Sequence, residues 1–228
     1  MHAILFDGYH DQVLEDIVGL LNDAGLNISS AATDVPALLP NRTLEDAISL
    51  GRYQTFTGKH SGFRRHEFTQ WRGQASLTCC QYTPSNRVRG TEGHQFHTYV
   101  DRTDTLPLMV DPIFRALDLE YTEDTEVKGI RLLKFAVPRR AFQANVTANK
   151  DFRIDVDGLQ PIAACSHNAP VYVGNPYFDH CPDSVKAAVN ITNADAPLPS
   201  FLAVEPTTGT TMEAHQRFQL SLKAGRDP

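Results

Sequence analysis

The sequence predicts a mainly β protein with short helices, and three observations lead to that class. Beyond Gly51 the chain consists of short alternating runs separated by Gly, Pro, Asn and Asp, which is typical of antiparallel strands. Helical periodicity is strongest in one segment near the N-terminus. No internal repeat, low-complexity tract or linker divides the 228 residues, so we expect one domain over residues 1–228.

The N-terminal segment Asp11–Leu21 carries apolar residues at helical spacing and predicts an amphipathic helix. Asp11 is its expected N-cap and Gly25 its expected stop. Residues 22–42 have no period and indicate a long exposed loop, after which a short helix is expected over residues 44–50.

Short strands are expected after that helix. Their bounds are Tyr53–Thr57, His66–Trp71, Leu117–Tyr121, Arg131–Val137, Val171–Gly174, Phe201–Glu205 and Gln216–Leu222. In the last of these, Phe218 and Leu220 alternate with Gln219 and Ser221, which predicts one buried face and one solvated face.

Charge and hydropathy exclude two classes of protein. The net charge is −6, from 21 Lys and Arg against 27 Asp and Glu, and the longest basic clusters are the pairs Arg64–Arg65 and Arg139–Arg140. We therefore expect no nucleic-acid partner. No sequence window reaches the roughly 18 consecutive apolar residues that a membrane span needs. Acidic residues within the first twenty positions exclude the apolar core of a signal peptide. Composition alone indicates a cytosolic domain.

Sequons argue against that compartment. Asn-x-Ser/Thr occurs at Asn27, Asn41, Asn145 and Asn190, which are four of the 10 asparagines. Ser and Thr make up 29 of 228 residues, so chance predicts about one such site. Coincidence in a Thr-rich chain is the alternative; we predict glycosylation at these positions on a translocated surface.

The residues show no convincing catalytic or metal site. His94, His97 and Asp101 form the most metal-like cluster, but flanking glycines indicate a loop, where the two imidazoles would diverge. The cysteines are Cys79, Cys80, Cys165 and Cys181, too few and too irregular to define a disulfide framework.

Nucleophile motifs are equally weak. Neither Ser166-His167 nor His180-Cys181 lies in a known catalytic signature, and the chain has no P-loop or dinucleotide fingerprint. We expect no catalytic residue, no metal and no cofactor. A metal-dependent or thiol enzyme built on His94, His97 and Cys80 stays as an alternative.

Motifs along the whole chain carry a resemblance. They are Gly8-Tyr9-His10-Asp11, Gly51 to Lys59, Trp71-Arg72-Gly73, Gly90-Thr91-Glu92-Gly93 with Phe96, Val127-Lys128-Gly129-Ile130 leading to Phe135 and Pro138, Ala169 to Val173 followed by Pro176 and Phe178, and Val204-Glu205-Pro206-Thr207-Thr208-Gly209 with Arg217 and Gln219. In order and spacing they resemble the ectodomain of the class B scavenger receptor family, which includes the fatty-acid translocase, the lysosomal integral membrane proteins and the insect sensory-neuron membrane proteins.

We expect a structural role for the residues matched to the motifs. They are Gly8, Tyr9, Asp11, Gly51, Tyr53, Thr57, Gly58, Trp71, Gly90, Thr91, Gly129, Pro138, Cys165, Pro176, Phe178, Glu205, Pro206, Thr208, Gly209 and Arg217. The chain also departs from the family pattern: Asp7 stands for a Trp, Ser85 and Phe114 stand for cysteines, and the cysteine cluster expected between Lys150 and Gly158 is absent. Because Phe114 holds the position of the usual partner of Cys165, no disulfide is inferred.

The resemblance implies an antiparallel β-barrel-like core that encloses an apolar tunnel for lipid. Residues 1–25 would end a helical head region and residues 51–224 would form the β core. Both transmembrane anchors would lie outside this chain, so we expect Met1 to be a fragment or gene-model start.

The implied partners are fatty acids, cholesterol or lipoprotein-type ligands and a membrane, reached through those anchors. The implied address is the plasma membrane or the lysosome, with this segment extracellular or lumenal. The alternative function is a glycoprotein interaction or lysosomal sorting module without lipid transport.

Overall fold

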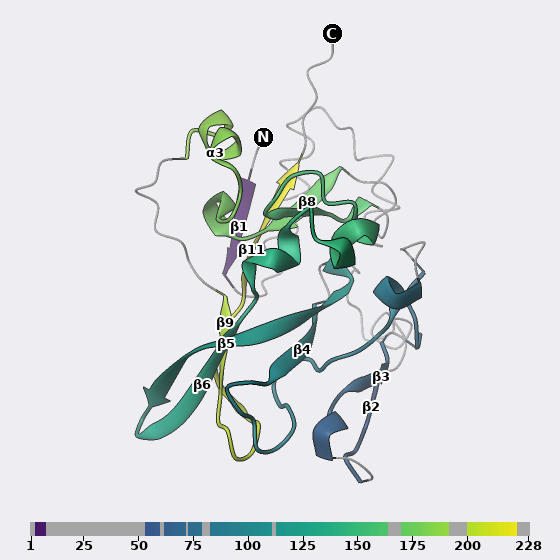
Figure 1. Ribbon diagram of the computed structural model, residues 1–228, viewed down its shortest axis with the longest axis vertical. Helices are drawn as coiled ribbons and strands as arrows, with labels where there is room; N and C mark the ends of the chain where they lie inside the picture. The colour runs from purple at the N-terminus through teal and green to yellow at the C-terminus, as the bar shows by residue number, and fades with distance from the viewer. Residues whose placement is uncertain are drawn as a thin grey trace, which may run out of the picture.

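A computed structural model describes residues 3–7, 53–59, 62–71, 73–78, 83–110, 113–163, 170–191 and 200–222. Within these ranges the chain is mainly β with short helices (Figure 1), which confirms the predicted class. The helices expected over residues 11–21 and 44–50 lie outside the described residues.

The larger sheet has five antiparallel strands in the order β10-β9-β6-β5-β4. They are β4 (Thr105–Val110), β5 (Arg115–Val127), β6 (Ile130–Ala136), β9 (Phe201–Val204) and β10 (Thr211–His215). The sheet curls, and β5 and β6 project from it as a long hairpin (Figure 1). Lys128 and Gly129 connect them, both at positive φ (52° and 81°), as the favoured two-residue hairpin turn requires.

The second sheet has four strands in the order β1-β11-β8-β7. They are β1 (Ala3–Asp7), β7 (Leu159–Pro161), β8 (Val171–Gly174) and β11 (Arg217–Leu222). The first and last strands within the described residues therefore pair, from Ala3 with Ser221 to Asp7 with Arg217. Because only Gln216 separates β10 from β11, the two sheets are joined by a single residue at this point.

A small hairpin of β2 (Gln54–Thr55) and β3 (Phe68–Gln70) packs outside the larger sheet. Phe68, Trp71, Leu77, Val88 and Met109 form the buried cluster beneath it. The short helices are η2 (Gly62–Arg64), η3 (Thr83–Asn86), η5 (Arg139–Phe142), η6 (Thr147–Phe152), η8 (Pro176–Phe178) and α3 (Asp183–Ala188).

The predicted strands agree with the structure in most places. The strand Val171–Gly174 is found with the predicted bounds, and those predicted at 131–137, 201–205 and 216–222 are found to within one residue at each end. Strand β4 was not predicted, because its central Pro107 and unbroken apolar run conceal the alternation. Proline is tolerated there because β4 is an edge strand.

The predicted solvated face of the last strand is wrong. Gln219 and Ser221 are only 1% exposed, whereas Phe218 and Leu220 on the opposite face are half-buried. β11 lies between β1 and β8 in the middle of its sheet, and the face that carries Gln219 and Ser221 is buried. The Gln219 side-chain amide donates to Ser221 Oγ at 3.1 Å, which satisfies part of the buried polar surface.

Candidate functional site

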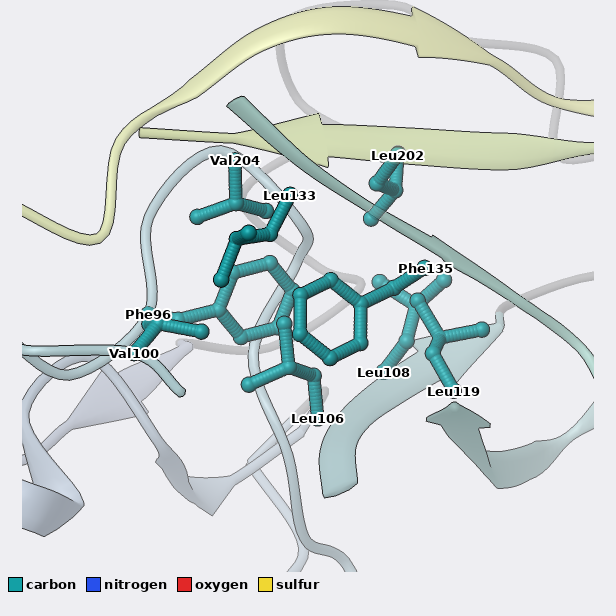
Figure 2. Close-up of a cluster of buried hydrophobic side chains, with 9 residues drawn as sticks. All are labelled: Phe96, Val100, Leu106, Leu108, Leu119, Leu133, Phe135, Leu202 and Val204. Carbon is teal, nitrogen blue, oxygen red and sulfur yellow. The ribbon is translucent and has the colours of Figure 1, made fainter. Parts of the chain in front are cut away.

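One face of the larger sheet carries an apolar cluster, here called the sheet cluster. Its members are Phe96, Val100, Leu106, Leu108, Leu119, Leu133, Phe135, Leu202 and Val204. Alternate residues of β4, β5, β6 and β9 supply most of it, since alternate side chains of a strand share one face. Figure 2 shows the rings of Phe96 and Phe135 at its centre with aliphatic side chains around them.

A second apolar cluster continues the first toward the smaller sheet and is called the joint cluster. Its buried members are Ile113, Leu117, Phe142, Ile162 and Val173. Phe218 and Leu220 of β11 pack against it but keep part of their surface accessible. Val110 and Val137 contact both clusters, so one apolar band runs from the sheet cluster to the smaller sheet.

One end of this band is covered by the loop of residues 93–100. Its backbone runs beside the β9–β10 turn: the Phe96 N–H donates to the Gly209 carbonyl at 2.8 Å, and the Val100 N–H donates to the Pro206 carbonyl at 2.8 Å. These bonds direct the side chains of Phe96 and Val100 into the sheet cluster. The motif Glu205 to Gly209 therefore fixes the loop that covers the cluster.

The turn itself is held by Glu205. Its carboxylate accepts hydrogen bonds from the Thr207 N–H (2.9 Å), the Thr208 N–H (2.7 Å) and Thr208 Oγ1 (2.7 Å). Hydrogen bonding from Thr208, and then the backbone donors, lowers the pKa of Glu205 to about 2. Gly209 closes the turn at φ +73°, where an added Cβ would lie 2.1 Å from the His97 carbonyl oxygen.

Gly90 and Thr91 hold the other side of the same loop. Gly90 has φ +83°, and a Cβ there would lie 2.6 Å from the Pro107 carbonyl oxygen. The Thr91 N–H donates to that oxygen at 3.0 Å, and the Met109 N–H donates to the Thr91 carbonyl at 2.9 Å. Two motifs more than a hundred residues apart thus position one loop.

A buried arginine, which the sequence analysis did not single out, braces the joint between the sheets. The Arg115 guanidinium donates to the Ala141 carbonyl (3.0 Å), Gln160 Oε1 (3.0 Å) and Asn149 Oδ1 (2.7 Å). Its Cζ lies 3.9 Å from the centre of the Phe152 ring. These contacts tie β5 to η5, η6 and β7, and no local sequence signal could have identified partners from such distant segments.

The remaining motif residues are dispersed over the fold. Trp71 is buried beneath the β2–β3 hairpin, Pro176 and Phe178 are buried in η8, and the guanidinium of Arg217 donates to His215 Nδ1 at 2.9 Å. Tyr53, Thr57, Gly58, Gly129 and Pro138 lie in hairpins and turns or next to them. Gly8, Tyr9, Asp11, Gly51 and Cys165 lie outside the described residues.

The histidines of the metal-like cluster diverge. The His94 side chain is 84% exposed beside Glu92, whereas the His97 side chain is 13% exposed and faces Asp104, with 3.7 Å between Nε2 and Oδ2. Across the described ranges, no three His, Cys, Asp or Glu side chains are grouped as metal ligands.

The cysteine positions bear on the thiol-enzyme alternative. Cys181 is a buried free thiol whose pKa is raised to about 12 by desolvation, so it carries little thiolate at neutral pH. Cys79, Cys80, Ser166 and His167 lie outside the described residues, as does Cys165.

Two of the sequons can be placed. Asn145 follows η5 and Asn190 follows α3, and both side chains are exposed, as glycan attachment requires. Asn27 and Asn41 lie outside the described residues. None of the described helices is long and apolar enough to cross a bilayer.

The curled antiparallel sheet, its apolar band and the loop that covers it define a mainly β domain with a continuous apolar interior. The chain belongs to the CD36 family, whose model matches residues 1–228. It is similar to lysosome membrane protein 2 of Rattus norvegicus, with 23% identity over 97% of this chain and 45% of that protein. It is also similar to scavenger receptor class B member 1 of Sus scrofa, with 27% identity over 75% of this chain and 35% of that protein.

The match to the mouse lysosome membrane protein 2 is 24% identical over 75% of this chain and 37% of that protein. This chain thus spans less than half the length of the relatives that it matches.

Proposed function

We propose that this chain is part of a scavenger-receptor-like ectodomain that binds lipids or lipoprotein-type ligands and passes lipid along its interior toward a membrane. The observation that carries the proposal is the apolar band, which continues from the sheet cluster to the smaller sheet through Val110 and Val137. Membership of the CD36 family supports it.

An acyl chain is the ligand that such a band suits. Each methylene group removed from water contributes about 0.8 kcal/mol, and hydrocarbon makes no demand for hydrogen bonds. In the sheet cluster the side chains fill the interior, whereas Phe218 and Leu220 at the joint keep accessible apolar surface. The joint is therefore where we place the lipid contact.

The relatives and the exposed sequons support a membrane address. One group of relatives is named for the lysosome membrane and another as a scavenger receptor. Exposed sequons at Asn145 and Asn190 support an extracellular or lumenal position for this segment. We accordingly place the protein at the plasma membrane or the lysosome, in place of the cytosolic compartment that composition alone indicates.

Titration of the purified chain with cis-parinaric acid, a fluorescent fatty acid, tests the proposal. We expect saturable binding that Leu220→Trp weakens about tenfold, because the larger ring fills the accessible surface at the joint. Met212→Trp is the matched control, since Met212 is 45% exposed on β10. If Leu220→Trp lowers the melting temperature, Val137→Phe is the second test, because Val137 follows β6 and contacts the apolar band from the side of the larger sheet.

Two results would overturn the proposal. One is fluorescence no greater than with an unrelated acidic protein of similar size. The other is equal binding by wild type, Leu220→Trp and Val137→Phe while all three remain folded.

A further inference from the structure

The segment from Lys59 to Gly90 has a charge opposite to that of the rest of the chain. It contains six Lys or Arg residues and one acid, Glu67, so its net charge is +5, whereas the whole chain carries −6. The other residues therefore carry −11. A basic region on an acidic protein concentrates electrostatic attraction for anions at one place.

Part of this basic segment lines a cleft of about 370 Å³ between the β2–β3 hairpin and residues 87–89. Its charged side consists of three arginines, Arg64, Arg87 and Arg89, and one acid, Glu67, and its apolar surface comes from Phe68, Val88 and Pro107. The cleft is accessible to solvent, since Phe63 and Arg87 in its lining are exposed. The two sides of the cleft are joined by a backbone hydrogen bond, in which the Phe68 N–H donates to the Gly90 carbonyl at 2.8 Å.

The arginines of the cleft differ in their partners. Arg64 Nε donates to Glu67 Oε2 at 3.0 Å, and Arg89 makes a two-pronged pair with the Asp118 carboxylate. Arg87 is exposed and has no ion pair within the described part of the chain. Its guanidinium is therefore the group in the cleft that is available to a carboxylate from outside.

An exposed aromatic ring is part of the cleft lining. Phe63 is 75% exposed, and its ring centroid lies 5.4 Å from that of His97. Arginine and aromatic side chains are enriched at protein interfaces, while lysine is depleted. The lining combines three arginines and one acid, Glu67, with Phe63 and Phe68, and it contains no lysine.

We propose that this arginine cleft docks an extended acidic segment of a partner protein. A carboxylate of the segment pairs with Arg87, and a neighbouring apolar side chain covers Phe63 and Pro107. A partner protein fits better than a small molecule, since a cleft lined by the exposed Phe63 and Arg87 would leave a small ligand largely solvated. The cleft lies on the outer side of the larger sheet, so the proposal does not depend on lipid transfer.

Fluorescence anisotropy with a fluorescein-labelled peptide of repeated Asp-Glu-Leu tests the proposal on the whole chain. We expect binding that Arg87→Glu weakens about tenfold and Phe63→Ala severalfold. Lys128→Glu makes the same charge change on an exposed turn of the β5–β6 hairpin and should leave binding unchanged. Binding should also weaken as salt is raised, because exposed charges are screened.

Thermal melting of each variant shows whether it is folded; Phe63 and Arg87 are exposed, so both variants should melt as wild type does. Equal weakening of peptide binding by Arg87→Glu and Lys128→Glu would overturn the proposal, because it would show non-specific electrostatic attraction that does not depend on the cleft. Equal binding of a repeated Asn-Gln-Leu peptide would overturn it as well. Self-association that Arg87→Glu abolishes would identify a second copy of this chain as the occupant and exclude the acidic partner.

Discussion

Trp71 and Phe114 lie edge to face, with ring centroids 6.2 Å apart and ring planes at 90°. Phe114 stands where the family resemblance places a cysteine, immediately before β5 (Arg115–Val127). The contact attaches the segment after the β2–β3 hairpin to the outer face of the larger sheet. Such aromatic pairs contribute about 0.5–1.5 kcal/mol beyond the area they bury.

Phe114→Ala should therefore destabilise the chain. Trp71 is 3% exposed and Phe114 half-buried, so we expect the free energy of unfolding to fall by about 2–3 kcal/mol. Urea unfolding followed by tryptophan fluorescence measures this, since Trp71 is the one tryptophan of the chain. Phe114→Leu should cost less because it keeps most of the apolar contact, and an equal loss in both variants would contradict the role given to the ring.

Gly209→Ala and Gly129→Ala separate backbone strain from steric conflict. Both glycines have similar positive φ angles, +73° and +81°. A Cβ at Gly209 would lie 2.1 Å from the His97 carbonyl oxygen, whereas a Cβ at Gly129 would meet nothing within 4 Å. We expect Gly129→Ala to cost about 1 kcal/mol and Gly209→Ala at least about 2 kcal/mol more. Similar midpoints of urea unfolding for the two variants would show that the β9–β10 turn can move away from the loop of residues 93–100.

The Glu205 carboxylate should make stability depend on acid pH. Its pKa is lowered to about 2 in the folded state against an ordinary value of 4.5, so its contribution is present above about pH 4.5. That contribution is lost as the pH falls toward 2. Glu205→Gln should melt below wild type at pH 6, and the difference should shrink on acidification. A constant difference between pH 6 and pH 3 would argue against an ionised Glu205 as the anchor of the turn.

Asn145→Gln and Asn190→Gln should each remove one glycan when the chain is secreted from animal cells. Both asparagines are exposed, and Thr147 of the first sequon is exposed too. Gel mobility before and after peptide N-glycosidase treatment measures the loss. Asn149→Gln is a control outside any sequon, although Asn149 is buried against Arg115, so that variant also reports on folding. Unchanged mobility in both sequon variants would contradict secretory-pathway exposure.

The elements found from sequence are those whose signal is local. The alternation of the strands at 131–137, 171–174 and 201–205 is a property of a few adjacent residues. The order of the motifs indicated the family for the same reason, because each motif is a short segment. β4 was not predicted because Pro107 interrupts its local pattern, although an edge strand tolerates a proline.

The sequence by itself determined the mainly β class, most strand positions, the sequons and the family of this protein. Only the tertiary structure decided that Gln219 and Ser221 are buried, that Arg115 braces two sheets, and that Arg64 and Arg87 share a cleft. The burial of a side chain and the identity of its contact partners depend on which strands become neighbours. That choice rests on contacts between segments far apart in the chain, which no local pattern encodes.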